Sequence, residues 1–406
     1  MISICESSRL VGLVLLSAAL SGPAIAGDLD RSPASVDDSE GHTDSPFDLL
    51  ERDGGAAIIN GEAATRDDYP QTGGLLIDTI IDGGSWGSYP IQTFMCSSTL
   101  IAPDVVLIAA HCVDPVALTY GYGELVDTTY VWSRQADLST YDASRTGLAW
   151  PDDAVVVADT VYHPDWDLFS LGLGLDENYD IALVFLSEPV LDVEAALLPT
   201  ADEGAALAEG TEVAVVGWGQ QVHVDGWGSP PAGTYMIKQQ GMSHIAEIGA
   251  PEMQVGKEES DVRKCHGDSG GPSFAWVGQG TTETMRLVGV TSHAYDSSDC
   301  AETGGVDTRV DFYLDWIDSE MRARCEDGSR VWCDEPGILP TDYYEPVVAD
   351  DSGLGDDGSD DGSDDGDEVD GSGGDGDKGG CMHAAGAMSG LGLMASLVAV
   401  ARRRDD

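Results

Sequence analysis

Residues 265–272 read Cys-His-Gly-Asp-Ser-Gly-Gly-Pro, a serine enclosed by glycines next to an aspartate and a cysteine. A serine hydroxyl is a poor nucleophile at neutral pH, so it needs a neighbouring base that a third group orients. Glycines let the backbone turn tightly, and converging N–H groups can stabilise the oxyanion that forms when the hydroxyl attacks a carbonyl. We therefore predict that Ser269 is a nucleophile and that the N–H groups of Gly267 and Ser269 form an oxyanion hole.

A base and an orienting acid for Ser269 are present earlier in the chain. His111 ends the apolar run 107–110 and precedes a cysteine. Asp180 precedes the apolar run 181–186, IALVFL. A carboxylate that leads an apolar strand enters the interior and needs a partner there, and an imidazole N–H is a suitable one. We therefore predict a catalytic set in the chain order His, Asp, Ser.

The chain between residue 58 and about residue 300 is built from short apolar runs separated by Gly, Pro, Asp and Ser turns. Many short strands with frequent turns indicate an antiparallel barrel or sandwich. The runs are 74–81, 98–110, 181–186, 212–217 and 286–291. Residues 308–324 differ, because Val310, Tyr313, Leu314 and Ile317 recur at helical spacing. They predict a terminal helix.

Three sequence blocks together resemble the trypsin/chymotrypsin family of serine proteases. They are AAHC at 109–112, DIAL at 180–183 and GDSGGP at 267–272, accompanied by GWG at 217–219. The resemblance covers about 58–320 and implies an all-β fold of two packed six-stranded antiparallel Greek-key β-barrels with a C-terminal helix. It implies a serine endopeptidase that hydrolyses protein or peptide substrates through an acyl-enzyme intermediate, with no cofactor and no metal.

The resemblance also implies activation by proteolysis. Family members begin their mature chain with an Ile-Val-Gly-Gly-like sequence, and residues 58–61, Ile-Ile-Asn-Gly, fit this pattern. A cut before Ile58 would free an ammonium group that could pair with Asp268, since a buried carboxylate needs a partner. The residue before the cut is Ala57, so the activating protease is not expected to be trypsin-like. The alternative is a strand start that is not processed.

Six of the eight cysteines fall in the part of the chain that is expected to fold, an even number consistent with three disulfides. The resemblance implies the first two pairs. The third pair remains, and it would close a small loop after the helix. The pairs are Cys96–Cys112, Cys265–Cys300 and Cys325–Cys333.

The substrate pocket is where the chain departs from trypsins, which carry an aspartate six residues before the nucleophile. Arg263 occupies that position and Lys264 follows it. Like charges would meet there, so cleavage after Lys or Arg is not expected. Arg263 could select acidic side chains, or it could turn to solvent or pair with an acid such as Asp307. The pocket walls are expected from Ser292, His293, Ala294, Gly304 and Gly305.

Two residues of the pocket wall carry further expectations. Ser292 is expected to hydrogen-bond near Asp180. His293 stands where the family usually has tryptophan, and Ala294 where it usually has glycine. The segment between His111 and Asp180 is long, so we expect surface loops there that restrict access to the site.

The N-terminal residues carry an export signal. Residues 10–20 are apolar but too short to span a bilayer comfortably, and Ala-Ile-Ala at 24–26 provides a cleavage site. Residues 1–26 therefore predict a signal peptide, with an uncleaved anchor as the alternative. Export to an oxidising compartment favours disulfides. Residues 27–57 lack periodicity and predict a propeptide or flexible arm.

The protease-like domain is expected to span residues 58–324, and the residues that follow it fall into three parts. Residues 325–348 are expected to form the small disulfide loop and an extension. Residues 349–380 are rich in Gly, Ser and Asp and predict an extended, self-repelling linker. Calcium binding by this linker stays open, although no EF-hand loop is present. Residues 381–406 hold Cys381, an apolar stretch and three arginines.

This last segment is similar to the MYXO-CTERM sorting signals of some deltaproteobacteria. The similarity implies that this segment interacts with a membrane. The protein would then be secreted and anchored at the cell surface or outer envelope of a Gram-negative bacterium. Cys381 would be the processing or attachment site. A plain single-span anchor is the alternative.

The net charge of −54 argues against nucleic acid as a partner, because phosphates would be repelled. Three functions remain: an active endopeptidase that an activating protease processes, a catalytically inactive homologue that acts as a surface binding protein, and a structural surface protein with an acidic stalk. Only the first explains why a complete catalytic set is present.

Overall fold

β-strands dominate the computed structural model, which describes residues 58–343 except 122, 144, 223–229, 279–282, 297–302 and 342. These described residues belong to one compact unit. The expected signal peptide, N-terminal arm, acidic linker and sorting segment lie outside them, and so does Cys300.

Six antiparallel strands close the first barrel, in the order β2-β3-β4-β7-β6-β5. β2 pairs with both β3 and β5, and this pairing closes the ring. The strands are β2 Thr72–Asp82, β3 Ser88–Ala102, β4 Val105–Ile108, β5 Glu124–Ser133, β6 Val155–Tyr162 and β7 Ala182–Leu186. β4 and β7 are buried throughout, because apolar side chains fill both of their faces.

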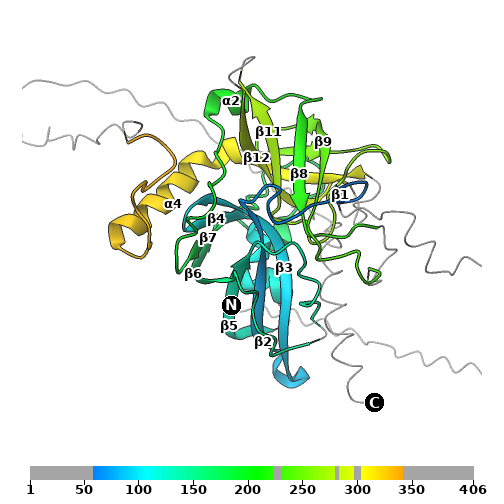
Figure 1. Ribbon diagram of the computed structural model, residues 1–406, viewed down its shortest axis with the longest axis vertical. Helices are drawn as coiled ribbons and strands as arrows, with labels where there is room; N and C mark the ends of the chain where they lie inside the picture. The colour runs from blue at the N-terminus through cyan, green and yellow to red at the C-terminus, as the bar shows by residue number, and fades with distance from the viewer. Residues whose placement is uncertain are drawn as a thin grey trace, which may run out of the picture. The chain divides into compact units, whose positions relative to one another are not determined.

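Six further strands form the second barrel, in the order β9-β10-β13-β12-β11-β8, and β8 pairs with β9 to close it. Their bounds are β8 Glu212–Gly217, β9 Gln239–Ile248, β10 Glu252–Val255, β11 Pro272–Val277, β12 Thr284–Ala294 and β13 Gly305–Arg309. A short strand, β1 (Glu62–Ala63), adds to the edge of β9. In Figure 1 the blue and cyan strands of the first barrel lie beside the green and yellow strands of the second. The predicted two-barrel fold is confirmed.

Helices are short, apart from the terminal one. They are α1 Pro115–Thr119, α2 Ala201–Ala205 and α4 Leu314–Asp327, with 3-10 turns η1 Gly84–Trp86, η2 Ala110–Cys112, η3 Leu168–Ser170 and η5 Val310–Tyr313. The prediction of a helix over 308–324 was therefore wrong at its start. The first two of these residues, 308 and 309, end β13, and the 3-10 turn η5 follows before α4 begins. Both η5 and α4 bury apolar side chains, among them Val310, Tyr313 and Ile317. No helix in the described part of the chain is long and apolar enough to cross a bilayer.

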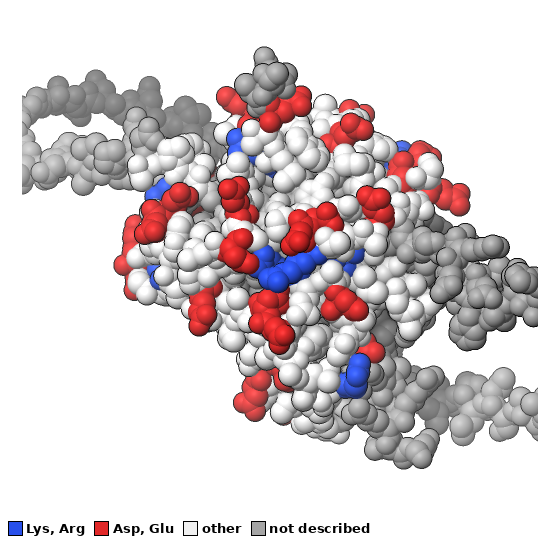
Figure 2. Space-filling view, in the orientation of Figure 1, with Lys and Arg blue, Asp and Glu red and all other residues white. Residues whose placement is uncertain are grey.

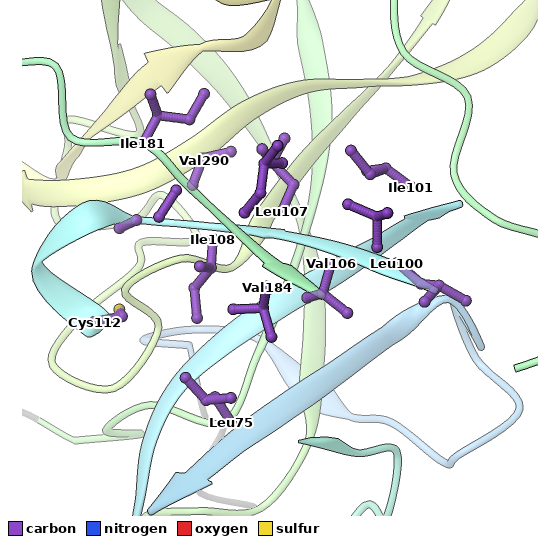
Figure 3. Packing of buried hydrophobic residues seen from close by; sticks show 14 of the residues in the cluster. Leu75, Leu100, Ile101, Val106, Leu107, Ile108, Cys112, Ile181, Val184 and Val290 are labelled. Carbon is purple, nitrogen blue, oxygen red and sulfur yellow. The ribbon is translucent and has the colours of Figure 1, made fainter. Parts of the chain in front are cut away.

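One hydrophobic cluster joins the two barrels and the helix. It includes Leu75, Val106 and Val184 of the first barrel, Val290 of β12 and Ile317 of α4, all of them buried. Figure 3 shows Val290 packed near the β4 side chains. Truncation of such a side chain to alanine costs about 2–5 kcal/mol. The cluster therefore keeps the two barrels, and the loops between them, in a fixed arrangement.

The predicted single run 98–110 is two strands, because a turn at Pro103 and Asp104 separates β3 from β4. Asp104 is fully buried and pairs with Arg330 at 2.7 Å. Arg330 lies just after α4, in the loop that the Cys325–Cys333 disulfide closes. The third predicted disulfide is thus present, and its loop is fixed to the first barrel by a buried ion pair.

Acidic side chains are scattered over the face shown in Figure 2, with few basic ones between them. Several of the basic side chains are engaged by acids. Arg134 pairs with Asp192 at 2.5 Å, and Arg324 pairs with Asp159 at 3.0 Å. A surface of this kind favours solubility and repels phosphate groups.

Candidate active site

His111 is held by its neighbours in the chain and by Asp180. It lies in η2, directly after the buried strand β4, and Cys112 is joined to Cys96. Its backbone N–H donates to Asp180 Oδ1 at 3.0 Å, and its ring Nδ1 lies 2.8 Å from Asp180 Oδ2. A carboxylate only accepts hydrogen bonds, so Nδ1 carries the proton and Nε2 is left as the basic nitrogen.

Asp180 is fully buried, and both of its carboxylate oxygens accept hydrogen bonds. Besides the two bonds from His111, its Oδ2 accepts from Ser292 Oγ at 2.6 Å, as predicted for Ser292. Its backbone oxygen accepts from Thr308 Oγ1 at 3.0 Å. The residue before it, Tyr179, has φ +55°, a conformation that costs about 1–3 kcal/mol in a residue with a side chain. Tertiary contacts therefore hold this backbone in place.

The pair shifts the pKa of both partners. Burial alone would lower the pKa of His111, but the Asp180 carboxylate outweighs burial and raises it. Burial alone would raise the pKa of Asp180, but the His111 charge and the hydrogen bonds from His111 and Ser292 lower it. The arrangement thus favours an ionised acid beside an imidazole that accepts protons readily.

The loop that carries Ser269 lies against the segment that carries His111. A Cβ on Gly270 would be 2.5 Å from Ile108 Cγ1 and 3.2 Å from the nitrogen of Ala109, so the two segments touch. Gly270 N–H donates to the oxygen of Thr291 at 2.8 Å, which fixes the loop to β12. Ser269 itself is partly exposed. The structure thus brings the predicted nucleophile and base onto adjoining segments, one from each barrel.

The backbone at Gly267, one of the two predicted oxyanion donors, is held by a contact with the first barrel. Gly267 has φ +94°, which favours glycine. Its carbonyl accepts from Ser97 Oγ at 2.9 Å, which fixes the orientation of the adjoining peptide group. Within the described residues, neither Gly267 N–H nor Ser269 N–H donates a hydrogen bond. Sequence reasoning missed Ser97, for which only its position after Cys96 offered a signal.

The position of the Asp268 carboxylate explains why the block at 217–219 has glycine at both of its ends. Its carboxylate accepts from Gly219 N–H at 2.8 Å and from Cys265 N–H at 2.9 Å. A Cβ on Gly219 would be 2.5 Å from the Asp268 Cγ, and one on Gly217 would overlap Asp268 Oδ1, so both positions need glycine. Burial raises the pKa of Asp268 to about 7.

Ile58 lies elsewhere in the uncut chain. It is fully buried and packs in the hydrophobic cluster of the second barrel, while the next residue, Ile59, pairs with Arg263. Among the described hydrogen bonds, Asp268 is held by backbone amides and not by Ile58. The predicted ammonium–carboxylate pair therefore concerns the cleaved form.

Both cations at the predicted pocket floor are engaged by protein groups. Lys264 is fully buried, with its Nζ 2.6 Å from Asp307 and 2.9 Å from Ser273 Oγ. Burial lowers the pKa of Lys264, although Asp307 opposes this. Arg263 is buried too, and its Nη2 donates to the oxygen of Glu259 at 3.0 Å. Asp307, offered by the sequence as a partner of Arg263, thus pairs with Lys264.

The other predicted wall residues lie on neighbouring strands. Ala294 at the end of β12 pairs with Gly305 at the start of β13. A Cβ on Gly305 would be 4.0 Å from Lys264 Cβ, so the wall adjoins the floor. Gly304 has φ +74° and lies against the backbone of Gly256, which excludes any larger residue.

Two further contacts beside the catalytic set had no sequence signal. Trp166 Nε1 donates to Asp114 Oδ2 at 3.0 Å, and its ring lies 6.4 Å from the His111 ring. Glu252 of β10 accepts from Asn178 Nδ2 at 3.0 Å, and burial raises the pKa of Glu252 to about 8. Isolated acids in strands and loops are too common to be singled out from one sequence.

One group of metal-ligating side chains in the described residues is compact enough to be considered as a metal site. It consists of Cys96, His111 and Cys112. Both sulfurs are in the Cys96–Cys112 disulfide and are not thiolates, so they cannot serve as ligands. While the disulfide is intact, this group therefore does not form a metal site.

Two closed antiparallel barrels with a carboxylate-held imidazole and a glycine-flanked serine between them define the two-barrel class of serine proteases. The Trypsin family model matches residues 58–317, and the chain belongs to this family. It is thus a serine-type endopeptidase, a hydrolase.

Three relatives show how far the similarity extends. The chain is 25% identical to Serine protease Hayan of Drosophila melanogaster over 64% of its own length but only 38% of that protein. It is 28% identical to Phenoloxidase-activating factor 3 of Holotrichia diomphalia, over 65% of this chain and 72% of the relative. It is 29% identical to Chymotrypsin-like elastase family member 1 of Canis lupus familiaris, over 65% and 92% of the two chains.

Proposed function

We propose that the protein is a catalytically active endopeptidase in which Ser269, His111 and Asp180 act together. Ser269 Oγ attacks the substrate carbonyl while His111 Nε2 takes its proton, and the imidazolium then donates that proton to the leaving amine. Water hydrolyses the acyl-enzyme in the second half of the reaction, with His111 again as the base. The N–H groups of Gly267 and Ser269 stabilise the oxyanion in both halves.

The observation that carries this proposal is the double hydrogen bond between Asp180 and His111. One bond holds the backbone and the other holds the ring, so the basic nitrogen has one defined direction. The contact between Gly270 and the Ile108–Ala109 segment supports the approach of the nucleophile to that nitrogen.

The proposal includes a zymogen. Asp268 is buried with two amide donors, and burial raises its pKa to about 7, although these bonds and the charge of Lys264 oppose the rise. A cut between Ala57 and Ile58 would supply an ammonium for this carboxylate and order the adjoining oxyanion loop. Its protease is not expected to recognise a basic residue, because alanine precedes the cut.

The proposed substrates are proteins or peptides without Lys or Arg at the scissile bond. Arg263 and Lys264 occupy the predicted floor of the pocket. Asp307 offsets the charge of Lys264, but the Arg263 charge would disfavour a further cation there. An acidic preference requires Arg263 to direct some of its five guanidinium N–H donors toward the substrate carboxylate. A peptide library cleaved equally after Glu and Ala would exclude it.

A fluorophosphonate probe tests the catalytic proposal. The full chain is treated with proteases that cut at residues 57–58, the new N-terminus is verified by mass spectrometry, and labelling is compared with that of Ser269→Ala. Labelling of the wild type alone supports the proposal. If the correctly cut, folded wild type stays unlabelled, the protein is the inactive homologue that binds a partner at its surface.

We also propose that the protein is exported and anchored through residues 381–406. The support is the sequence pattern of the two ends, which lie outside the described residues. Mass spectrometry of the mature protein from cell envelopes would show an N-terminus after Ala26 or Ala57 and a modified or cleaved C-terminus near Cys381. An intact chain recovered from the cytoplasm would contradict it.

A further inference from the structure

His293 stands between the catalytic acid and a distant loop. Its Nδ1 lies 3.0 Å from Ser292 Oγ, and its Nε2 lies 3.1 Å from the carbonyl oxygen of Gly174. Ser292 Oγ in turn donates to Asp180 Oδ2 at 2.6 Å. A continuous line of polar contacts therefore leads from the carboxylate that holds the catalytic imidazole to a loop outside the two barrel walls.

The segment that His293 reaches is residues 168–177, which we call the apolar loop. Gly174 N–H also donates to the oxygen of Tyr295 at 2.5 Å, so the loop is docked on the end of β12 at two points. Phe169 and Leu173 of this loop are 71% and 49% exposed. The apolar loop thus places an apolar surface beside the strand that is expected to form a wall of the substrate pocket.

The imidazole of His293 faces two acceptors, Ser292 Oγ and the Gly174 carbonyl oxygen, and each of them needs a proton from the ring. The single hydroxyl hydrogen of Ser292 is directed to Asp180, so Ser292 Oγ can only accept from His293 Nδ1. The Gly174 carbonyl also only accepts, so it needs a proton on Nε2. A neutral imidazole carries one N–H, and both contacts are complete hydrogen bonds only in the cation.

The surroundings of His293 favour the neutral ring. Burial lowers its pKa, and the charge of His111 acts in the same direction. The Gly174 carbonyl and the carboxylates of Asp180 and Asp307 oppose this without reversing it. In the neutral ring the Ser292 contact and the Gly174 contact therefore compete for one proton.

We propose that His293 is a positioning residue that supports Ser292 against Asp180 and holds the apolar loop beside the substrate pocket. The proposal rests on the proposed function, since both effects are on peptide hydrolysis. The Ser292 contact acts through the catalytic acid and therefore on kcat. The Gly174 contact acts on the apolar loop and therefore on the KM of peptides long enough to reach it.

Three variants separate these two contacts. His293→Asn carries an amide nitrogen at the place of Nδ1 and can donate to Ser292 but not reach Gly174. His293→Gln carries its amide nitrogen at the place of Nε2 and can donate to Gly174 alone. His293→Phe keeps a ring and makes neither bond. The processed protein would be assayed with a dipeptide and a hexapeptide of apolar residues that share the same scissile bond.

We expect His293→Phe to lower kcat and to raise the hexapeptide KM, and the two changes together should amount to about fivefold. The neutral ring has one proton to share between the two contacts, and about fivefold is the effect of one ordinary hydrogen bond. His293→Asn should restore kcat but not KM, and His293→Gln should restore the hexapeptide KM but not kcat. Because His293 is also a predicted wall residue, any change in the dipeptide KM measures its effect on the pocket, and the hexapeptide KM is judged relative to it. Active-site titration and melting temperatures correct each rate for the fraction of folded enzyme.

The outcome that overturns the inference differs from failure of the proposed function. If the wild type is labelled and hydrolyses both peptides, but the three variants change kcat and KM together or not at all, His293 has no positioning role. If the wild type itself is neither labelled nor active, it is the catalytic proposal that fails.

Discussion

Two fully buried aspartates belong to the candidate site, Asp180 beside the base and Asp268 within the nucleophile loop, and their pKa values shift in opposite directions. The pKa of Asp180 is lowered, whereas that of Asp268 is raised to about 7. Both accept hydrogen bonds on both oxygens, three for the Asp180 carboxylate and two for that of Asp268, so burial does not separate them. The difference is the partner: Asp180 bonds to an imidazole that can hold a positive charge. Asp268 accepts from the amides of Gly219 and Cys265, and the more distant charge of Lys264 lowers its pKa without outweighing burial.

This difference separates the part of the candidate site that is already arranged in the uncut chain from the part that cleavage would change. The acid and base of the catalytic set are already joined, with the carboxylate stabilised in its charged form. The carboxylate beside the oxyanion loop lacks a bonded cation within the described residues, and a buried charge without a partner is costly. Activation would therefore act on Asp268 and leave the Asp180–His111 pair as it is.

The largest effect is expected from removing the charge of Asp180. Asp180→Asn keeps the shape but presents an amide to His111 and favours the wrong tautomer of the imidazole. We expect kcat/KM of the processed enzyme to fall about 10⁴-fold. Asp165→Asn, which removes a mostly exposed charge from a nearby loop, should leave kcat/KM within about twofold. A loss below tenfold for Asp180→Asn would mean that this pair does not serve catalysis.

The second effect is on stability and concerns Asp268. Its folded pKa of about 7 lies above the value of about 3.9 in an unfolded chain. The folded precursor therefore binds the extra proton, and its stability is greatest below about pH 3.9 for this group and falls by a few kcal/mol as pH rises through about 7. Urea unfolding of the Ser269→Ala precursor between pH 4 and 8 measures this fall.

Cleavage before Ile58 provides the matched control for that measurement. An ammonium next to Asp268 would lower its pKa and remove the fall in stability between acid and neutral pH. The unfolding free energies of the cut and uncut proteins should therefore diverge as pH rises. Parallel pH profiles would show that no cation reaches Asp268.

The smallest effect is expected at Gly219, where a side chain would meet the Asp268 carboxylate. Gly219→Ala puts a methyl group 2.5 Å from Asp268 Cγ, so the carboxylate or the loop must move. We expect a loss of about 2 kcal/mol in unfolding free energy, typical of overpacking. Gly172→Ala, where the nearest side-chain atom would be 3.7 Å away, is the control and should be nearly neutral. Equal losses would indicate a general backbone effect.

The sequence predicted the strands better than their ends. The runs 181–186 and 212–217 correspond to β7 and β8 within one residue, because continuous apolar segments bounded by turns have few alternatives. The run 98–110 was divided by a turn at Pro103–Asp104, and Asp104 is buried because Arg330 reaches it. The helix start was misplaced, because apolar spacing is the same in η5 and α4 but does not mark where one becomes the other.

The chain's residue pattern by itself predicted an antiparallel barrel or sandwich and the side chains that could supply a nucleophile, a base and an acid. These predictions follow from local chemistry: short apolar runs between turns, glycines around a serine, and an acid that leads a buried strand. The two-barrel fold and the Cys96–Cys112 pair were implied by the family resemblance of the sequence. Only the tertiary structure decided which partner each buried charge meets. Lys264 takes Asp307, Asp268 takes the amide of Gly219, and His293 reaches Gly174, because these partners lie far apart in sequence and meet only when the chain folds.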